Sequence, residues 1–168
     1  VIVIFLLFLL AMADADMTAS SEACGLKRGE SGKCVPCETL DKSAILTPEA
    51  LATSLSEIPM WAIKPHSGDG EVSTLSRSFT AKNFVAAMAA LNAMGEICEE
   101  LGHHADFHLT SYREVEIVVY THSVKGCTRN DVELCMRLDK DIKVAYSPKW
   151  LREHPSAAGT EIVAAKKS

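Results

Sequence analysis

The longest run of regularly spaced apolar residues lies at 80–101 and predicts the longest helix of the chain. Apolar side chains recur there every three or four positions, which places them on one face of an α-helix. The predicted buried stripe consists of Phe84, Met88, Leu91, Met94 or Gly95, Cys98 and Leu101. Gly102 follows where glycine commonly ends helices, because it adopts the left-handed conformation without steric cost. We therefore expect a five-turn helix ending at Leu101.

Two shorter helices are predicted by the residues that begin them. Thr47 can cap a helix whose first position is Pro48, and apolar residues follow at 51, 55 and 58. Thr128 is the second expected cap, with Asp131 three residues on, as in a capping box. The buried face of this last helix is predicted at Val132, Cys135, Leu138 and Ile142.

Four short segments have the composition of strands, and they come in two adjacent pairs. They lie at 61–63, 71–79, 107–112 and 114–121. In the last of them Val115, Ile117 and Val119 occupy alternate positions, which is typical of a strand with one buried face. Neighbouring strands joined by short turns pair as antiparallel hairpins.

The order of these elements is α-β-β-α-β-β-α, which predicts an α+β fold. We expect two layers, a four-stranded antiparallel sheet with the helices packed on one face. This domain is expected at 42–146. Residues 1–41 are expected to form an apolar segment followed by a flexible lead-in, and residues 147–168 a polar C-terminal tail.

The chain opens with thirteen uncharged and mostly apolar residues at 1–13. As a helix they would rise about 20 Å, which is too short to cross a bilayer core. One interpretation is a start that lies further along, at Met12 or Met17, and a cytoplasmic protein. The alternative is organelle or secretory targeting through residues 1–13, with Ala11 and Ala13 as a small-residue cleavage site.

Composition excludes some functions for this chain of 168 residues. Its 22 acidic and 17 basic side chains give a net charge of −5. Domains that bind nucleic acid through bulk charge carry a basic face, which this balance does not favour. Aromatic residues make up 6% of the chain, too few for a platform that stacks single-stranded bases.

Six cysteines are present, and two of them form a C-x-x-C pair, Cys34 and Cys37. A structural zinc site requires four ligands, and a second such pair does not occur in the sequence. The pair is thus interpreted as two cysteines in an exposed loop, with zinc binding or redox chemistry as the alternative. No metal is predicted.

Four of the six histidines fall within twenty residues, at His103, His104, His108 and His122. Imidazole is the side chain best able to give and take protons near neutral pH. Three of these histidines are expected at the ends of elements, where functional sites are commonly built. His108 lies within a predicted strand and is left out of the candidate site.

The residues around these histidines resemble the pterin-4α-carbinolamine dehydratase family. The similar pattern has Glu99 four residues before His103-His104, then Tyr112, then Thr121-His122, with Asp131 nine residues further on. Trp61 after Ile58-Pro59, the strand LSRSF at 75–79, and Lys82-x-Phe84 also match. The resemblance covers about residues 34–140, and the sequence CVPCE at 34–38 is similar to the plant-like branch of the family.

The resemblance implies an activity and roles for particular residues. The reaction is dehydration of 4a-hydroxytetrahydrobiopterin to quinonoid dihydropterin, without a cofactor, in tetrahydrobiopterin recycling. His103 and His122 are implied as acid and base, and His104 as a residue that binds or orients the pterin. The implied supporting residues are Glu99, Asp131, Trp61 and Asp106.

One departure from the family pattern follows the histidine pair. The family has proline there, and this chain has Ala105. Proline would restrict the preceding residue to extended geometry, so Ala105 loosens the constraint on His104.

The resemblance also implies assembly, as a homodimer or homotetramer. Neither direct nucleic-acid binding nor a membrane span in the mature domain is expected. The alternative function is a non-catalytic dimerisation or assembly partner, coactivator-like, with the same fold. A histidine metal site is a further alternative.

Overall fold

The computed structural model describes residues 32–68 and 70–160, and it contains one four-stranded sheet with helices around it. The strands are β1 (Ala62–Pro65), β2 (Ser73–Thr80), β3 (Asp106–Thr110) and β4 (Glu114–Val119). The helices are α1 (Pro48–Ser54), α2 (Phe84–Leu101), α3 (Arg129–Asp141) and α4 (Pro148–Glu153). Three short 3-10 helices lie at η1 (Cys37–Thr39), η2 (Lys42–Ala44) and η3 (Pro155–Thr160).

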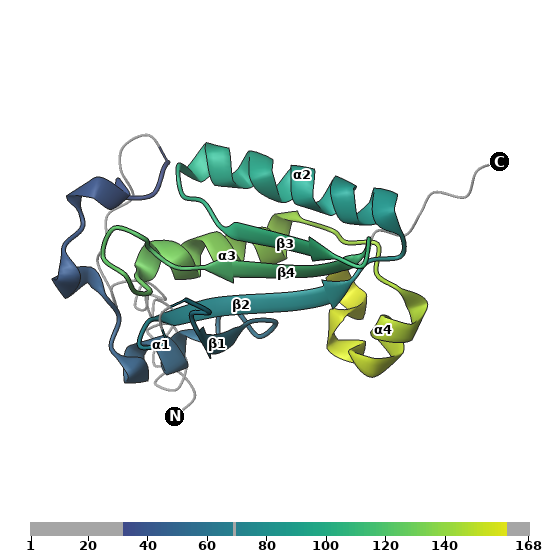
Figure 1. The fold of residues 1–168 in the computed structure, drawn as a ribbon, viewed down its shortest axis with the longest axis horizontal. Helices are drawn as coiled ribbons and strands as arrows, with labels where there is room; N and C mark the ends of the chain where they lie inside the picture. Colours follow the sequence, from purple (N-terminus) through teal and green to yellow (C-terminus); the bar gives the residue numbers. More distant parts are fainter. Residues whose placement is uncertain (1–31, 69, 161–168) are drawn as a thin grey trace, which may run out of the picture.

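The sheet is antiparallel throughout, with the strand order β1-β2-β4-β3. Leu75 of β2 pairs with Val119 of β4, and Ile117 of β4 pairs with Phe107 of β3. The long helices α2 and α3 contact each other on one side of this sheet (Figure 1). The predicted α+β fold of two layers is thus confirmed.

Helix α2 begins later than predicted, and its first two turns bury other residues than predicted. Thr80 is the last residue of β2, and Asn83 caps the helix by accepting a hydrogen bond from the backbone N–H of Ala86. The predicted stripe is right from Leu91 onward, since Leu91 packs against the core and Met94 is buried, but it is wrong at Phe84 and Met88, which are exposed. The buried positions of the first two turns are Ala87 and Ala90. Small side chains let a helix pack closely, which a search for large apolar residues does not detect.

Helix α3 begins and packs as predicted. Thr128 and Asp131 form the capping box, in which each side chain bonds the other residue's backbone N–H. Val132, Cys135 and Leu138 are buried, as is Ile142 just beyond the helix. The capping box fixes Asp131 in the first turn of the helix, where its carboxylate also contacts His103.

The hairpin of β3 and β4 is shorter than the predicted strands. Ser111 and Tyr112 have φ angles of 47° and 60°, so the chain leaves extended geometry after Thr110. At the other end β4 stops at Val119, and Thr121 forms an isolated bridge with Gly126. Residues 120–123 therefore leave the sheet and turn towards the start of α3.

Residues 33–38, which we call the N-terminal strap, are held against the domain by hydrogen bonds. The N–H of Cys34 donates to the carbonyl oxygen of Leu101, at 3.0 Å. The Asn130 side chain donates to the carbonyl oxygen of Val35, and the Ser123 hydroxyl to that of Cys37, both at 2.8 Å. The expectation of a flexible lead-in is wrong for the strap, which lies where α2 ends (Figure 1).

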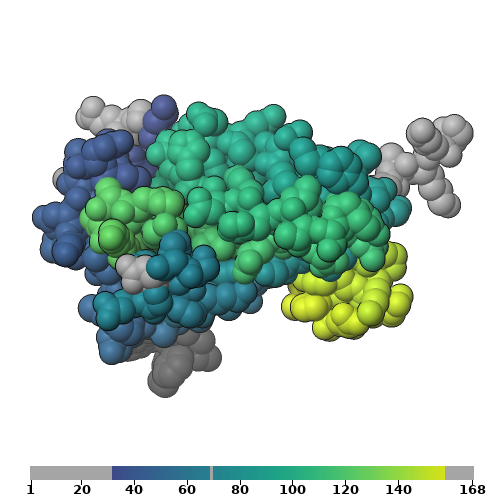
Figure 2. Space-filling model, in the orientation of Figure 1, coloured from purple at the N-terminus to yellow at the C-terminus, as the bar shows by residue number. Residues whose placement is uncertain are grey.

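The residues after α3 also differ from the predicted polar tail. Helix α4 and the following 3-10 helix cover residues 148–160, and Ala157 is fully buried. Trp150 stacks on Tyr146, with ring centroids 4.6 Å apart. Helix α4 lies at the opposite end of the molecule from the strap, as both views show (Figure 1 and Figure 2). Residues 161–168 of the predicted tail fall outside the described residues, as does the apolar segment 1–13. Among the described helices, none has the length and apolar character of a membrane span.

Candidate active site

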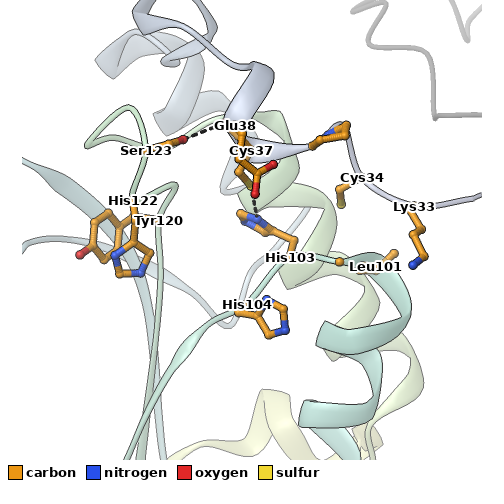
Figure 3. Close-up of a pocket in the computed structure, with 12 residues that line it drawn as sticks. Lys33, Cys34, Cys37, Glu38, Leu101, His103, His104, Tyr120, His122 and Ser123 are labelled. Carbon is orange, nitrogen blue, oxygen red and sulfur yellow. Dashed lines mark hydrogen bonds between the residues drawn. The ribbon is translucent and has the colours of Figure 1, made fainter.

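A cavity of about 580 Å³ lies between the strap, the end of α2 and residues 120–123. In the space-filling view the strap and its neighbours pack beside residues 120–127 at one end of the molecule (Figure 2). The cavity is lined by Lys33, Cys34, Pro36, Cys37, Glu38, Leu101, Gly102, His103, His104, Tyr120, His122 and Ser123. The fold therefore brings the three histidines of the sequence pattern to one cavity, from two separate segments of the chain (Figure 3).

His103 is the buried histidine of this set, with an exposed fraction of 3%. The main chain reaches this position through Gly102, which ends α2 with a left-handed φ of 65°, as predicted. The Nε2 atom of His103 lies 2.8 Å from Oδ1 of Asp131, and its Nδ1 atom lies 3.2 Å from Sγ of Cys37. Both ring nitrogens of His103 thus have partners within the protein.

The carboxylate of Asp131 is fully buried and accepts hydrogen bonds on both oxygens. Its Oδ2 atom accepts from the backbone N–H of Thr128 at 2.6 Å and from the hydroxyl of Thr121 at 2.8 Å. Its Oδ1 atom faces His103. A buried carboxylate is stable when its oxygens are paired in this way. Asp131 therefore caps α3 and orients His103 at the same time.

His104 points away from His103, towards the solvent (Figure 3). Its Nε2 atom lies 2.9 Å from Oε1 of Glu99, and the side chains of His104 and Glu99 are 62% and 80% exposed. At this exposure an ion pair adds little to stability. Glu99 can nevertheless orient the ring of His104 at the edge of the cavity.

His122 lies across the cavity from the histidine pair. Its ring centroid is 4.1 Å from that of Tyr120, and its Nε2 atom is 3.8 Å from Oδ1 of Asp106. Burial, together with the charge of Asp106, raises the pKa of the Tyr120 hydroxyl. Since the side chain of His122 is 59% exposed, its ring nitrogens are accessible to a ligand.

Two residues considered from the sequence lie away from this cavity. Trp61 was expected to shape the pocket, but it is in the core and donates to Asp139, at 3.0 Å. Arg77 binds the same carboxylate of Asp139, so Trp61 belongs to a buried polar network between the sheet and α3. His108 is exposed on the side of the sheet that the helices leave open, and it does not line the cavity.

The structure adds lining residues that the sequence did not indicate. Cys37 was expected in an exposed loop, but it contacts His103 inside the cavity. Burial, followed by the charge of Asp131, raises the pKa of its thiol, so Cys37 is protonated at neutral pH. Tyr120 and Ser123 were also missed. The C-x-x-C spacing was the one available signal, and it does not specify a histidine partner sixty-six residues away.

The titratable side chains at this cavity suit proton transfer. It holds one buried imidazole backed by a carboxylate and two exposed imidazoles, which together can donate and accept protons near neutral pH. Within residues 32–68 and 70–160, no group of three or more histidine, cysteine, aspartate or glutamate side chains is arranged to hold a metal ion.

The chain is similar to a protein family and to several known proteins. The family model described as pterin 4 alpha carbinolamine dehydratase matches residues 44–141. Pterin-4-alpha-carbinolamine dehydratase 2, mitochondrial, of Arabidopsis thaliana is 30% identical over 70% of this chain, and the chain spans 60% of that protein's length. A putative pterin-4-alpha-carbinolamine dehydratase of Saccharophagus degradans is 36% identical over 62% of this chain and 89% of its own length. A crystal structure of a transcriptional coactivator/pterin dehydratase from Brucella melitensis is 26% identical, with a TM-score of 0.48, over 56% of this chain and 94% of that one.

Proposed function

Because the chain belongs to the pterin 4 alpha carbinolamine dehydratase family, a family of hydro-lyases, we propose that it dehydrates 4a-hydroxytetrahydrobiopterin to quinonoid dihydropterin and water. This reaction would serve tetrahydrobiopterin recycling. The observation that carries the proposal is the convergence of His103, His104 and His122 on one cavity. No cofactor takes part in the proposed reaction.

The proposed mechanism divides the two proton transfers between two histidines. His122 donates a proton to the 4a-hydroxyl, and the C–O bond breaks as water leaves with the bonding electron pair. His103 takes a proton from the pterin ring, and the electrons of that N–H bond form the new double bond. Asp131, 2.8 Å from His103, stabilises the imidazolium that results. One imidazole cannot easily reach both positions, which is why two are needed.

His104 and the acidic residues have supporting roles in this proposal. His104 binds the pterin at the edge of the cavity, and Glu99 orients its ring through the 2.9 Å contact. Asp106 faces His122 at 3.8 Å and balances its charge when it is protonated. Trp61 has no part in the revised site, because its side chain is in the core.

The test is the rate at which the purified full chain dehydrates chemically prepared 4a-hydroxytetrahydropterin. We expect turnover above that of an equal concentration of imidazole. The matched control is the double variant His103→Ala/His122→Ala, which should approach the uncatalysed rate. A wild-type chain that is folded, as shown by circular dichroism, but no faster than the double variant would contradict the proposed activity.

A second candidate function, as a non-catalytic dimerisation or assembly partner, is favoured by one observation. The outer face of α2 exposes Phe84, Val85 and Met88, with exposed fractions of 51%, 75% and 37%. Adjacent exposed apolar side chains commonly mark interaction surfaces. A chain that assembles but has no dehydratase activity would support this second function.

Assembly itself is proposed as a homodimer or homotetramer that uses this face of α2. Light scattering coupled to size exclusion should give a mass of two or four chains. Val85→Glu, which places a charge in the face, should lower that mass, whereas Glu96→Lys on the same helix should change it less. A monomeric wild-type chain would contradict the proposal.

For location we propose the cytoplasm, with targeting through residues 1–13 as the alternative. The relative from Arabidopsis carries the word mitochondrial in its name. A fusion of residues 1–31 to a fluorescent protein distinguishes these two locations. Diffuse fluorescence supports the cytoplasm, and fluorescence in an organelle or the secretory route supports targeting.

A further inference from the structure

The N-terminal strap, residues 33–38, supplies one wall of the candidate active site. Five of its six residues line the cavity. It lies before residues 44–141, to which the family model matches. Its hydrogen bonds join it to three separate places, namely the end of α2, residue 123 and the first turn of α3. With these three anchors and the contact of Cys37 with His103, the strap has a defined position relative to His103.

Within the strap, Cys37 is the residue that reaches His103. Its Sγ atom lies 3.2 Å from Nδ1, whereas Asp131 contacts the other ring nitrogen, Nε2. The thiol is protonated at neutral pH, because burial raises its pKa. A protonated thiol is a donor, so it donates to Nδ1, and the hydrogen on Nε2 is donated to Asp131.

We propose that Cys37 is a positioning residue, whose thiol holds the imidazole of His103 in one orientation with the lone pair of Nδ1 facing the cavity. This inference rests on the proposed function and deepens it. The S–H group is a weak donor, so Nδ1 can still take a proton from a substrate N–H group that enters the cavity. The thiol stays beside the ring during this step, so the ring is held on the Nδ1 side by Cys37 and on the Nε2 side by Asp131.

The expected effect of Cys37 is on the chemical step rather than on substrate binding. An imidazole that is held at one nitrogen only can rotate about its remaining contact. Displacement of a reacting group by about 1 Å costs up to about a hundredfold in rate. Substrate affinity should change less, because His104 and the other walls of the cavity remain.

The experiment compares Cys37→Ala with Cys37→Ser in the full chain. Alanine removes the S–H donor, whereas serine keeps a donor, an O–H group, at the same position on Cβ. Thr39→Val is the matched control. It removes the hydrogen bond from the Thr39 hydroxyl to the carbonyl oxygen of Pro36, which precedes the same 3-10 helix, and Thr39 does not line the cavity. The measurements are kcat and KM for 4a-hydroxytetrahydropterin, thermal melting, and the imidazole ¹⁵N spectrum.

We expect Cys37→Ala to lower kcat at least about tenfold with KM changed less than about threefold, and Cys37→Ser to stay within about threefold of wild type. The Nδ1 resonance of His103 should shift in the alanine variant and remain near its wild-type position in Thr39→Val. The ¹⁵N spectrum needs no turnover, so it tests the contact even if the proposed activity is wrong.

Three outcomes would overturn the inference while leaving the dehydratase function intact. The first is wild-type kcat in Cys37→Ala. The second is an unchanged Nδ1 resonance of His103 in that variant. The third is equal loss of kcat in the alanine and serine variants with melting temperatures like wild type, since a hydrogen-bond donor would then not be what His103 requires. An inactive wild-type chain with a shifted Nδ1 resonance would instead contradict the proposed function alone.

Discussion

The Nε2 atom of His103 lies 2.8 Å from Oδ1 of Asp131, and both side chains are buried. The other histidines of the cavity differ, since His104 and His122 are more than half exposed. One histidine is thus part of the packed interior, and the other two are at the surface of the cavity. This difference in burial determines what each substitution is expected to do.

Alanine substitutions of the three histidines should separate catalysis from binding. His103→Ala and His122→Ala should each lower turnover at least about tenfold. His104→Ala should raise KM more than it lowers kcat, because its proposed role is to hold the pterin. The four rates, including His108→Ala as control, should be measured in one assay. Near-wild-type turnover in both His103→Ala and His122→Ala would contradict the assignment.

The same variants should differ in stability. His103→Ala leaves Asp131 buried without one of its partners, which costs about 1–3 kcal/mol. His104→Ala and His122→Ala remove exposed side chains and should change the free energy of unfolding by less than about 0.5 kcal/mol. Urea titration of the three proteins measures these values. Equal stability of all three would show that the buried contact adds nothing to folding.

Replacement of Asp131 by asparagine should affect both folding and turnover. The amide has one acceptor where the carboxylate has two, so either His103 or the start of α3 faces a donor instead. We expect a loss of about 1–3 kcal/mol in unfolding free energy and a drop in kcat of at least about tenfold. Asp141→Asn, in a more exposed ion pair with Arg137, is the control and should cost under about 1 kcal/mol.

Chelation should leave the activity unchanged. The proposed proton transfers use histidine side chains alone, and we expect turnover to be the same before and after dialysis against a strong chelator. Total metal in the dialysed protein is measured by elemental analysis. Loss of turnover that added zinc restores would support the histidine metal site and contradict the acid–base mechanism.

Cysteine reactivity should single out Cys37 among the cysteines of the described residues. Burial raises the pKa of Cys37 and that of Cys135, and it raises the pKa of Cys127 to about 12. The difference between them is therefore access, because Cys37 is partly exposed and the other four cysteines are buried. Alkylation of Cys37 and loss of activity should proceed with the same rate constant. Mass spectrometry of protein treated with iodoacetamide measures this, with the sixth cysteine, Cys24, which lies outside the described residues, replaced by serine. Faster labelling of Cys127 would contradict the packing described here.

The ion pair of Glu57 and Arg129 should make stability depend on pH. Two hydrogen bonds from the guanidinium, at 2.8 and 2.7 Å, lower the pKa of Glu57. A carboxylate with a lowered pKa in the folded state adds stability above its ordinary value of about 4.3, and that stability is lost as the pH falls through the folded value. Both side chains are partly exposed, so the contribution is below about 1 kcal/mol.

Glu57→Gln is the variant that tests this ion pair. Its unfolding free energy should be lower than that of wild type at pH 7, and the difference should shrink as the pH falls below the ordinary pKa of glutamate, about 4.3, to pH 3. A difference that is the same at both pH values would show that the loss does not come from the charge of Glu57.

The sequence by itself determined the elements whose signals are local. The capping box of Thr128 and Asp131, the stop at Gly102 and the pairing of adjacent strands each depend on residues a few positions apart. These signals were enough for the α+β fold. The histidine pattern likewise placed His103, His104 and His122 at ends of elements, which the fold then brings to one cavity.

Only the tertiary structure decided which side chains meet across long separations. Cys37 and His103 are sixty-six residues apart, and no local pattern relates a C-x-x-C segment to a histidine at the end of a helix. Trp61 matched the sequence pattern of the site but is buried beside Asp139, seventy-eight residues away. Burial and contact depend on how distant segments pack, whereas spacing along the chain specifies only neighbours on the same helix or strand.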